Sequence, residues 1–155
     1  MKPILVVGYG NPLRRDDGAG ARAAQELADR WPESAMHVEI SHQLLIEQAA
    51  ALAEADYVVF IDAAKGPAPG TVRWRAVSPG SPDSGSMTHF LTPETLLGAS
   101  RQLYGRCPEA ALVSIDGADF GLGEELSPLV LSALPQAVAQ AERLIQCRLH
   151  EAGHA

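Results

Sequence analysis

The chain has 155 residues, enough for one domain that buries roughly 70% of its unfolded surface, and we expect a single domain over residues 1–155. A formal net charge of -7 argues against a nucleic-acid-binding face, and no apolar run approaches the roughly 20 residues that span a membrane. Cys107 and Cys147 form no CxxC pair, which argues against a disulfide framework or zinc knuckle and favours the cytoplasm.

Strands and helices alternate along the first third of the chain. Residues 3–10 form a continuous apolar run, typical of a central strand that is buried on both faces. Apolar residues at four-residue spacing predict a helix over 19–31, which Pro32 closes. Residues 37–41 indicate a short strand, and residues 44–55 a second helix rich in strong helix formers.

The middle of the chain predicts two strands, a long loop and a helix. Residues 56–64 repeat the buried-strand pattern, and 71–77 alternate apolar and basic residues as an edge strand does. The link between them is too short for a crossover helix, so the edge strand is expected to be antiparallel. Residues 78–89 have the composition of a loop, and Thr92 with Pro93 opens a third helix.

The last third of the chain predicts one more strand and a terminal helix. Residues 111–118 form the last buried strand. Ser127 and Pro128 open a helix that is kinked or interrupted near Pro135 and runs to about residue 150. The whole order predicts an α/β fold with about five strands in a mostly parallel twisted sheet, helices on both faces, and one antiparallel edge strand.

Acidic residues follow two strands that are expected to be neighbours. Asp16 and Asp17 follow the first strand, and Asp62 ends the third. Open α/β sheets bind ligands beyond the carboxyl ends of their strands, so a strand order of 2-1-3 brings these carboxylates together. His89 in the long loop is a third candidate, and two carboxylates with one imidazole form a set that a divalent transition metal accepts.

Each of these residues also has a purely structural interpretation. Asp16 or Asp17 can cap the helix that begins at residue 19, and we expect this role for Asp16. Asp62 can bind backbone N–H groups in a turn, and His89 and His42 can be ordinary loop histidines. Two further acids at the end of the last strand either border the same cleft or form turns, namely Asp116 and Asp119.

The glycines after the first strand do not form a dinucleotide-binding motif. Leu13 occupies the position of the third glycine of GxGxxG, and Asp16 and Asp17 would repel phosphate. Ser41 and His42 occupy the end of the second strand, where an acid would bind ribose. A nucleotide-binding module is therefore disfavoured.

Four segments together resemble one known family, the hydrogenase maturation proteases, which trim the C-terminal extension from the large subunit of nickel-iron hydrogenases. They are "GYGNPLRRDDGAG", "VVFIDA", "MTHFLTPETLL" and "GADFGLGEELSP". The resemblance implies a five-stranded α/β domain whose site consists of Asp17, Asp62 and His89, as both catalytic and metal-binding residues. Asp16 is then a supporting or capping neighbour.

The resemblance also implies a partner and a metal. The partner is the nickel-iron hydrogenase large-subunit precursor, and the precursor itself supplies the nickel, with no organic cofactor. We expect a cytoplasmic monomer without nucleic-acid or membrane partners. Where many members carry Asp-Gly-Gly, this chain has "ISHQLL", similar to the subgroup that serves cytoplasmic bidirectional or NAD-linked hydrogenases. The alternative function is a nickel-binding carrier or checkpoint protein that cuts no peptide bond.

Overall fold

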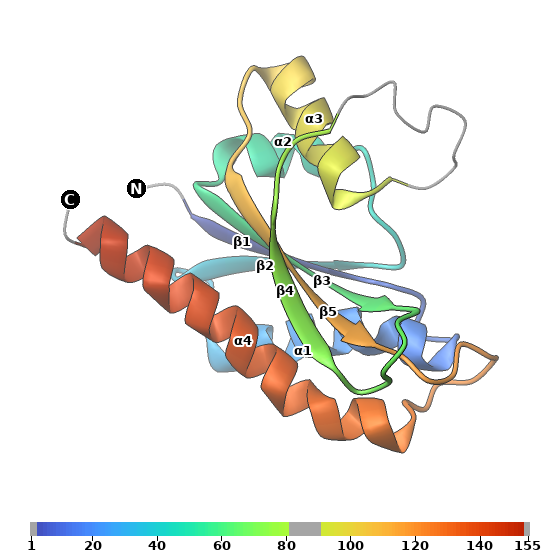
Figure 1. The fold of residues 1–155 in the computed structure, drawn as a ribbon. Coiled ribbons are helices and arrows are strands. Elements are labelled where there is room, and N and C mark those ends of the chain that lie inside the picture. The colour runs from blue at the N-terminus through green and yellow to red at the C-terminus, as the bar shows by residue number, and fades with distance from the viewer. Residues whose placement is uncertain (1–2, 81–90, 154–155) are drawn as a thin grey trace.

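The computed structural model describes residues 3–80 and 91–153, which form one mixed sheet with helices on both faces (Figure 1). The strands are β1 (Ile4–Tyr9), β2 (Met36–Ser41), β3 (Tyr57–Ala64), β4 (Val72–Val77) and β5 (Glu109–Asp116). The helices are the short 3-10 helix Arg15–Gly18, α1 (Ala19–Arg30), α2 (Gln48–Glu54), α3 (Pro93–Tyr104) and α4 (Pro128–Gly153). No helix in the described ranges is both long and apolar enough to cross a membrane.

The sheet has the strand order β2-β1-β3-β5-β4. β1 pairs in parallel with β2 and β3, β3 pairs in parallel with β5, and β4 runs antiparallel to β5 at the edge. The sheet therefore has the 2-1-3 arrangement on which the convergence of the acids depends, and the antiparallel edge strand is confirmed. The chain leaves β1 and β3 at the same edge of the sheet. After β1 the chain adds β2 on one side and then β3 on the other, so the gap between β1 and β3 is the topological switch point.

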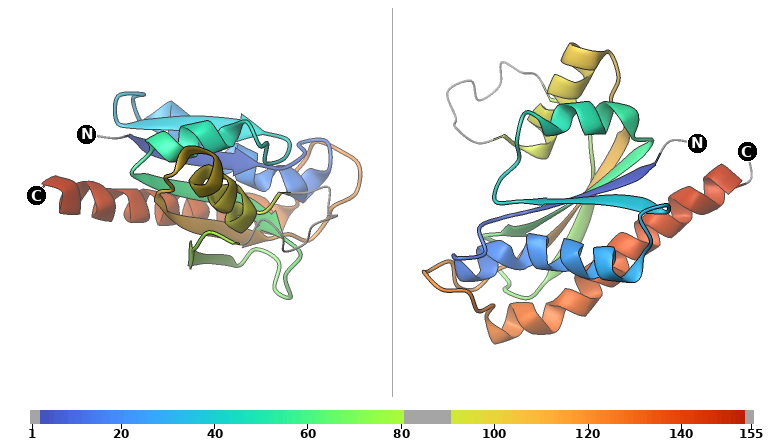
Figure 2. Two further views of the ribbon diagram at one scale, coloured as in Figure 1. Left: turned by 90° about the horizontal axis from the view of Figure 1, so that it is seen from above. Right: turned by 180° about the vertical axis from the view of Figure 1, so that it is seen from behind.

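Each face of the sheet packs against its own pair of helices (Figure 2). Helices α1 and α4 cover one face through a cluster that includes Val6, Leu27 and Val138. Helices α2 and α3 cover the other face through a cluster that includes Phe60 and Leu96. β1, β3 and β5 have apolar residues that pack on both faces, which explains their continuous apolar sequences.

Two helix predictions need correction. The helix predicted over 44–55 begins at Gln48. Residues 46 and 47 form a turn before it, and the Gln48 side chain binds the Leu45 N–H. The interruption predicted near Pro135 is absent from α4, which is continuous from Pro128 to Gly153. Pro135 lies on the exposed face of this helix, where water can bind the carbonyl group that the proline leaves without a donor.

Candidate active site

Asp17 and Asp62 line one cleft at the carboxyl edge of the sheet, with a volume of about 960 Å³. We call it the carboxylate cleft. Its walls come from the ends of β1 and β3, the segment 42–45 and the first turn of α3. The sheet topology thus places two acids that are distant in sequence beside the same space, as the strand order predicts.

Asp17 is held by the turn that follows β1. Its Oδ2 accepts a hydrogen bond of 2.7 Å from the Asn11 N–H, which joins the two ends of the turn. Gly10 has φ +141°, a backbone conformation that L side chains rarely adopt, and its N–H binds the Ser41 carbonyl at 3.1 Å. The glycine therefore lets the chain turn at the strand end and present Asp17 to the cleft.

Asp62 lies within β3. Among the acids that the structure describes, it has the pKa that is shifted furthest from its ordinary value. Burial raises its pKa to about 7, although hydrogen bonds from the Tyr9 hydroxyl and the Ala63 N–H lower it, and the charge of Asp17 adds to the increase. A carboxyl group with a pKa near 7 exchanges its proton readily at neutral pH, as a general acid or base must.

Tyr9 is the neighbour that the sequence interpretation missed. Gly8 pairs with Ile61 across β1 and β3, so the next residues, Tyr9 and Asp62, end up side by side at the mouth of the cleft. Burial, followed by the charge of Asp62, raises the pKa of the Tyr9 phenol, which therefore keeps its proton and donates to Asp62. Only the pairing of the strands reveals this contact, because Tyr9 is read as part of an apolar strand.

Asp16 has a different role from the one expected. It is fully buried, and no side chain caps α1, so the capping prediction is wrong. Its carboxylate accepts hydrogen bonds from the N–H groups of Ala118 (2.8 Å), Asp119 (2.9 Å) and Ser127 (2.7 Å), and from the Ser127 hydroxyl (2.8 Å). Burial alone would raise the pKa of Asp16, but these bonds hold it below its ordinary value. Asp16 therefore supports the site by joining the β1 turn to the segment before α4.

The wall formed by residues 42–45 is fixed by the buried side chain of Gln48. Its Oε1 accepts from the Leu45 N–H at 2.9 Å, and its Nε2 donates to Glu39 at 3.3 Å and to the Ser41 hydroxyl at 3.4 Å. The Ser41 hydroxyl in turn donates to the Gln43 carbonyl at 2.7 Å. This network holds the "HQL" segment in a defined position beside the cleft.

The other residues that the sequence analysis singled out do not all lie at the carboxylate cleft. His89 lies outside the described residues, whereas His42 lines the carboxylate cleft. Asp116 does not line this cleft, because it is buried and forms an ion pair with Arg73 at 3.0 Å, and Asp119 forms an ion pair with Arg15 at 3.5 Å. Within residues 3–80 and 91–153, no group of three or more His, Cys, Asp or Glu side chains forms a metal site.

The chemistry of the cleft follows from its two carboxylates. A carboxylate ligates a divalent cation through oxygen, and a carboxyl group with a pKa near 7 transfers a proton to or from water. Both functions are available within one cleft that is large enough for an extended segment of peptide. Activation of water for attack on a peptide bond is a reaction that this arrangement can support.

Comparison with solved structures identifies the fold. The chain superposes on the hydrogenase maturating endopeptidase HybD from E. coli with a TM-score of 0.75 and 24% identity, over 93% of this chain and 92% of that one. The NiFe hydrogenase maturation protease HybD from Thermococcus kodakarensis gives 0.68 and 25%, over 92% and 99%. A hydrogenase 2 maturation peptidase from a Thaumarchaeota archaeon gives 0.71 and 24%, over 94% and 99%.

The fold expected from the resemblance is therefore confirmed over nearly the full length of the chain. No protein-family model matches the sequence, and no curated protein matches it either. The similarity is thus carried by the three-dimensional structure, at a sequence identity of about one quarter.

Proposed function

We propose that this protein is an endopeptidase that removes the C-terminal extension of a nickel-iron hydrogenase large-subunit precursor after nickel insertion. The observation that carries the proposal is the convergence of Asp17 and Asp62 in one cleft, on a fold shared with solved hydrogenase maturation proteases. The perturbed pKa of Asp62 adds a group suited to proton transfer at neutral pH.

In this proposal Asp17 and Asp62 both bind the cation, and Asp62 also handles the proton. Asp62 takes a proton from the attacking water and returns it to the leaving amine, and the Tyr9 hydroxyl holds its carboxylate in place. Asp17 has one oxygen bound to the Asn11 N–H, which fixes the direction of the other oxygen. His89 completes the proposed set as a nitrogen ligand for the same cation.

Nickel belongs to the substrate in this account. The precursor brings the ion, and Asp17, Asp62 and His89 recognise it, so that only a nickel-loaded precursor is aligned for cutting. Carboxylate and imidazole groups are suitable ligands for divalent transition metals, which supports this assignment. No organic cofactor takes part, and we propose that the enzyme acts as a cytoplasmic monomer.

The experiment that tests the proposal is cleavage of purified large-subunit precursors, followed by intact-mass analysis. The wild-type chain is expected to remove a C-terminal peptide, and Asp17→Asn and Asp62→Asn are each expected to reduce the rate at least about a hundredfold, the scale of general acid–base catalysis. Asp29→Asn is the matched control, because Asp29 is an exposed acid on α1 that does not line the cleft, and its rate should be unchanged.

Two results would contradict the proposal. Full activity in both Asp17→Asn and Asp62→Asn would exclude the cleft as the site of reaction. A wild-type chain that binds a precursor and its nickel but never shortens the precursor would favour the carrier or checkpoint protein instead.

A further inference from the structure

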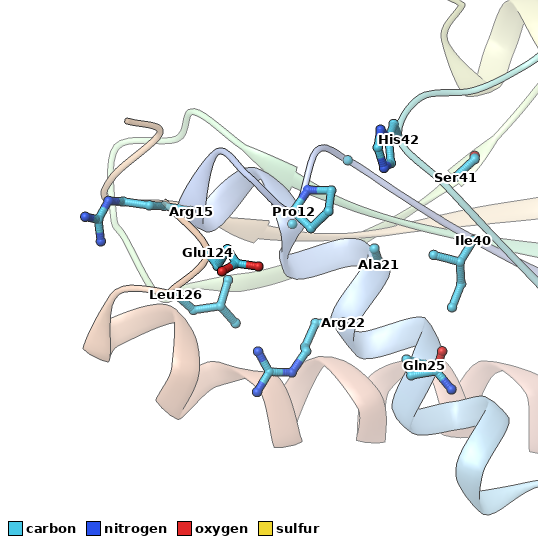
Figure 3. Close-up of a pocket in the computed structure, with 12 residues that line it drawn as sticks. Pro12, Arg15, Ala21, Arg22, Gln25, Ile40, Ser41, His42, Glu124 and Leu126 are labelled. Carbon is cyan, nitrogen blue, oxygen red and sulfur yellow. The ribbon is translucent and has the colours of Figure 1, made fainter. Parts of the chain in front are cut away.

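A second cavity of about 360 Å³ adjoins the carboxylate cleft, and we call it the side pocket. It lies between the start of α1, the end of β2 and the segment before α4 (Figure 3). Pro12 and Leu126 lie on one side of it and Ile40 on the other, with Ala21 between them (Figure 3). The candidate site described above makes no use of this cavity.

The side pocket and the carboxylate cleft share a wall. Gly10 and His42 line both cavities, and the Gly10 N–H binds the Ser41 carbonyl at 3.1 Å where the ends of β1 and β2 meet. An extended chain advances about 3.3–3.6 Å per residue, and its side chains alternate in direction. A peptide with its scissile bond beside Asp17 and Asp62 therefore places a neighbouring side chain over this wall.

The lining of the side pocket indicates what kind of side chain fits. Pro12, Ala21, Ile40 and Leu126 present carbon atoms to it, and Ile40 is 43% exposed in the absence of an occupant. Arg15, Arg22 and Glu124 also line the pocket, but the Arg15 guanidinium binds Asp119 and the Leu122 carbonyl, so Arg22 and Glu124 leave one charge of each sign. A concave apolar surface with a mixed polar rim is typical of a pocket for an uncharged group.

We propose that the side pocket is a specificity subsite that binds one uncharged, apolar side chain of the precursor, close to the scissile bond. This inference rests on the proposed function and deepens it, because it names the substrate feature that the enzyme reads in addition to nickel. Burial of that side chain contributes to binding, and its position fixes the register of the chain over Asp17 and Asp62.

Ala21 offers a direct test, since a larger side chain at this position fills the pocket from α1 without touching the carboxylate cleft. The probes are the precursor that the wild type cuts and a series in which each residue near the cut is replaced in turn by Ala, Leu or Asp. At one position we expect the wild type to prefer Leu over Asp by about tenfold or more in kcat/KM.

The variant Ala21→Phe should weaken the preference for a large apolar side chain. At the same position it should lose about tenfold on the Leu substrate and much less on the Ala substrate, because a filled pocket accepts a small side chain but excludes a large one. Gln102→Phe places the same aromatic residue at an exposed position of α3 outside both cavities and should cut all substrates as the wild type does. Melting temperatures confirm that both variants are folded.

The outcomes separate the subsite from the proposed function. If Ala21→Phe changes all substrates by the same factor, or none, the subsite is overturned while the protease assignment stands. If no substitution near the cut changes the wild-type rate, the subsite is also overturned. If the wild type cuts no precursor, the proposed function fails and the subsite fails with it.

Discussion

At the scale of single residues, Asp16 and Asp17 show how adjacent acids acquire different roles from their surroundings. Asp16 is buried and accepts four hydrogen bonds from the segment 118–127, whereas Asp17 faces the carboxylate cleft. The sequence predicts that Asp17 and Asp62 meet on the condition that the strand order is 2-1-3, which is the order in the structure. It does not predict the role of Asp16, because the partners of Asp16 lie about a hundred positions away.

Asp62→Asn is expected to increase stability while it removes activity. The folded state raises the pKa of Asp62 from 3.8 to about 7, so the folded protein binds an extra proton between these values. The cost of ionising Asp62 is therefore absent below about pH 4, grows as the pH rises, and is complete above pH 7. Asn carries no such cost. In thermal denaturation at pH 5, 6 and 8, the melting temperature of the variant relative to wild type should rise with pH, and a constant difference would contradict this.

Asp16→Asn is expected to destabilise the fold. The amide keeps the shape of the side chain but loses the charge and directs an NH2 group towards hydrogen-bond donors, which we expect to cost about 3 kcal/mol, or about 10 °C in melting temperature. Because the pKa of Asp16 is lowered in the folded state, this contribution is present above pH 3.8 and is lost at lower pH. Thermal denaturation from pH 3 to 7 should show the deficit shrinking in acid. Asp119→Asn is the exposed control, and an equal loss there would refute the assignment.

At the scale of elements, the contact between α1 and β3 determines where Asp62 lies. A Cβ atom on Gly20 would lie 2.8 Å from the Asp62 Cα and would collide with the Ile61 carbonyl. Gly20 therefore allows the first turn of α1 to pack directly on the backbone of the strand that carries the catalytic candidate.

Gly20→Ala is expected to lose about 2 kcal/mol of stability and to reduce cleavage, since α1 and β3 must move apart. Urea denaturation and the cleavage rate measure the two effects. At Gly121 an added Cβ meets only the end of the Asp119 side chain, at 3.1 Å, so Gly121→Ala should change little. A Gly20→Ala variant that is as stable and active as Gly121→Ala would show that the close approach has no role.

Pro135→Ala tests why α4 tolerates a proline in its interior. The helix is continuous through this exposed position, so the alanine variant should gain about 1–3 kcal/mol from restored helix propensity and hydrogen bonding. Chemical denaturation measures the gain, with Ser132→Ala as a control at a neighbouring exposed position. A loss of stability would instead indicate that the local geometry at Pro135 is needed for α4 to follow the sheet.

The predicted elements succeed where a known capping pattern decides and fail where the deciding side-chain contacts have no sequence signature. Thr92 and Pro93 begin α3 as predicted, with Thr92 and Thr95 forming reciprocal capping hydrogen bonds. The start of α2 is placed four residues early, because the sequence does not reveal that Gln48 bonds back to Leu45, Ser41 and Glu39. Composition alone also gives no sign that Tyr9 donates to Asp62.

At the scale of the whole molecule, the strand order brings the β1 turn, β3 and the "HQL" segment to one edge of the sheet. There they form two adjoining cavities, one lined by carboxylates and one largely apolar. The same fold occurs in solved hydrogenase maturation proteases at about one quarter identity, so the fold persists while most of the sequence differs. The proposed division of labour is that one cavity recognises the metal and the other a side chain.

The most direct test of the central claim is intact-mass analysis of a hydrogenase large-subunit precursor, incubated with this protein in nickel-loaded and nickel-free forms. We expect a C-terminal peptide to be lost from the nickel-loaded precursor alone, and Asp17→Asn to abolish the loss. Equal cutting of both forms would contradict the recognition of nickel, and no cutting of either form across several precursor classes would contradict the assignment as a maturation protease.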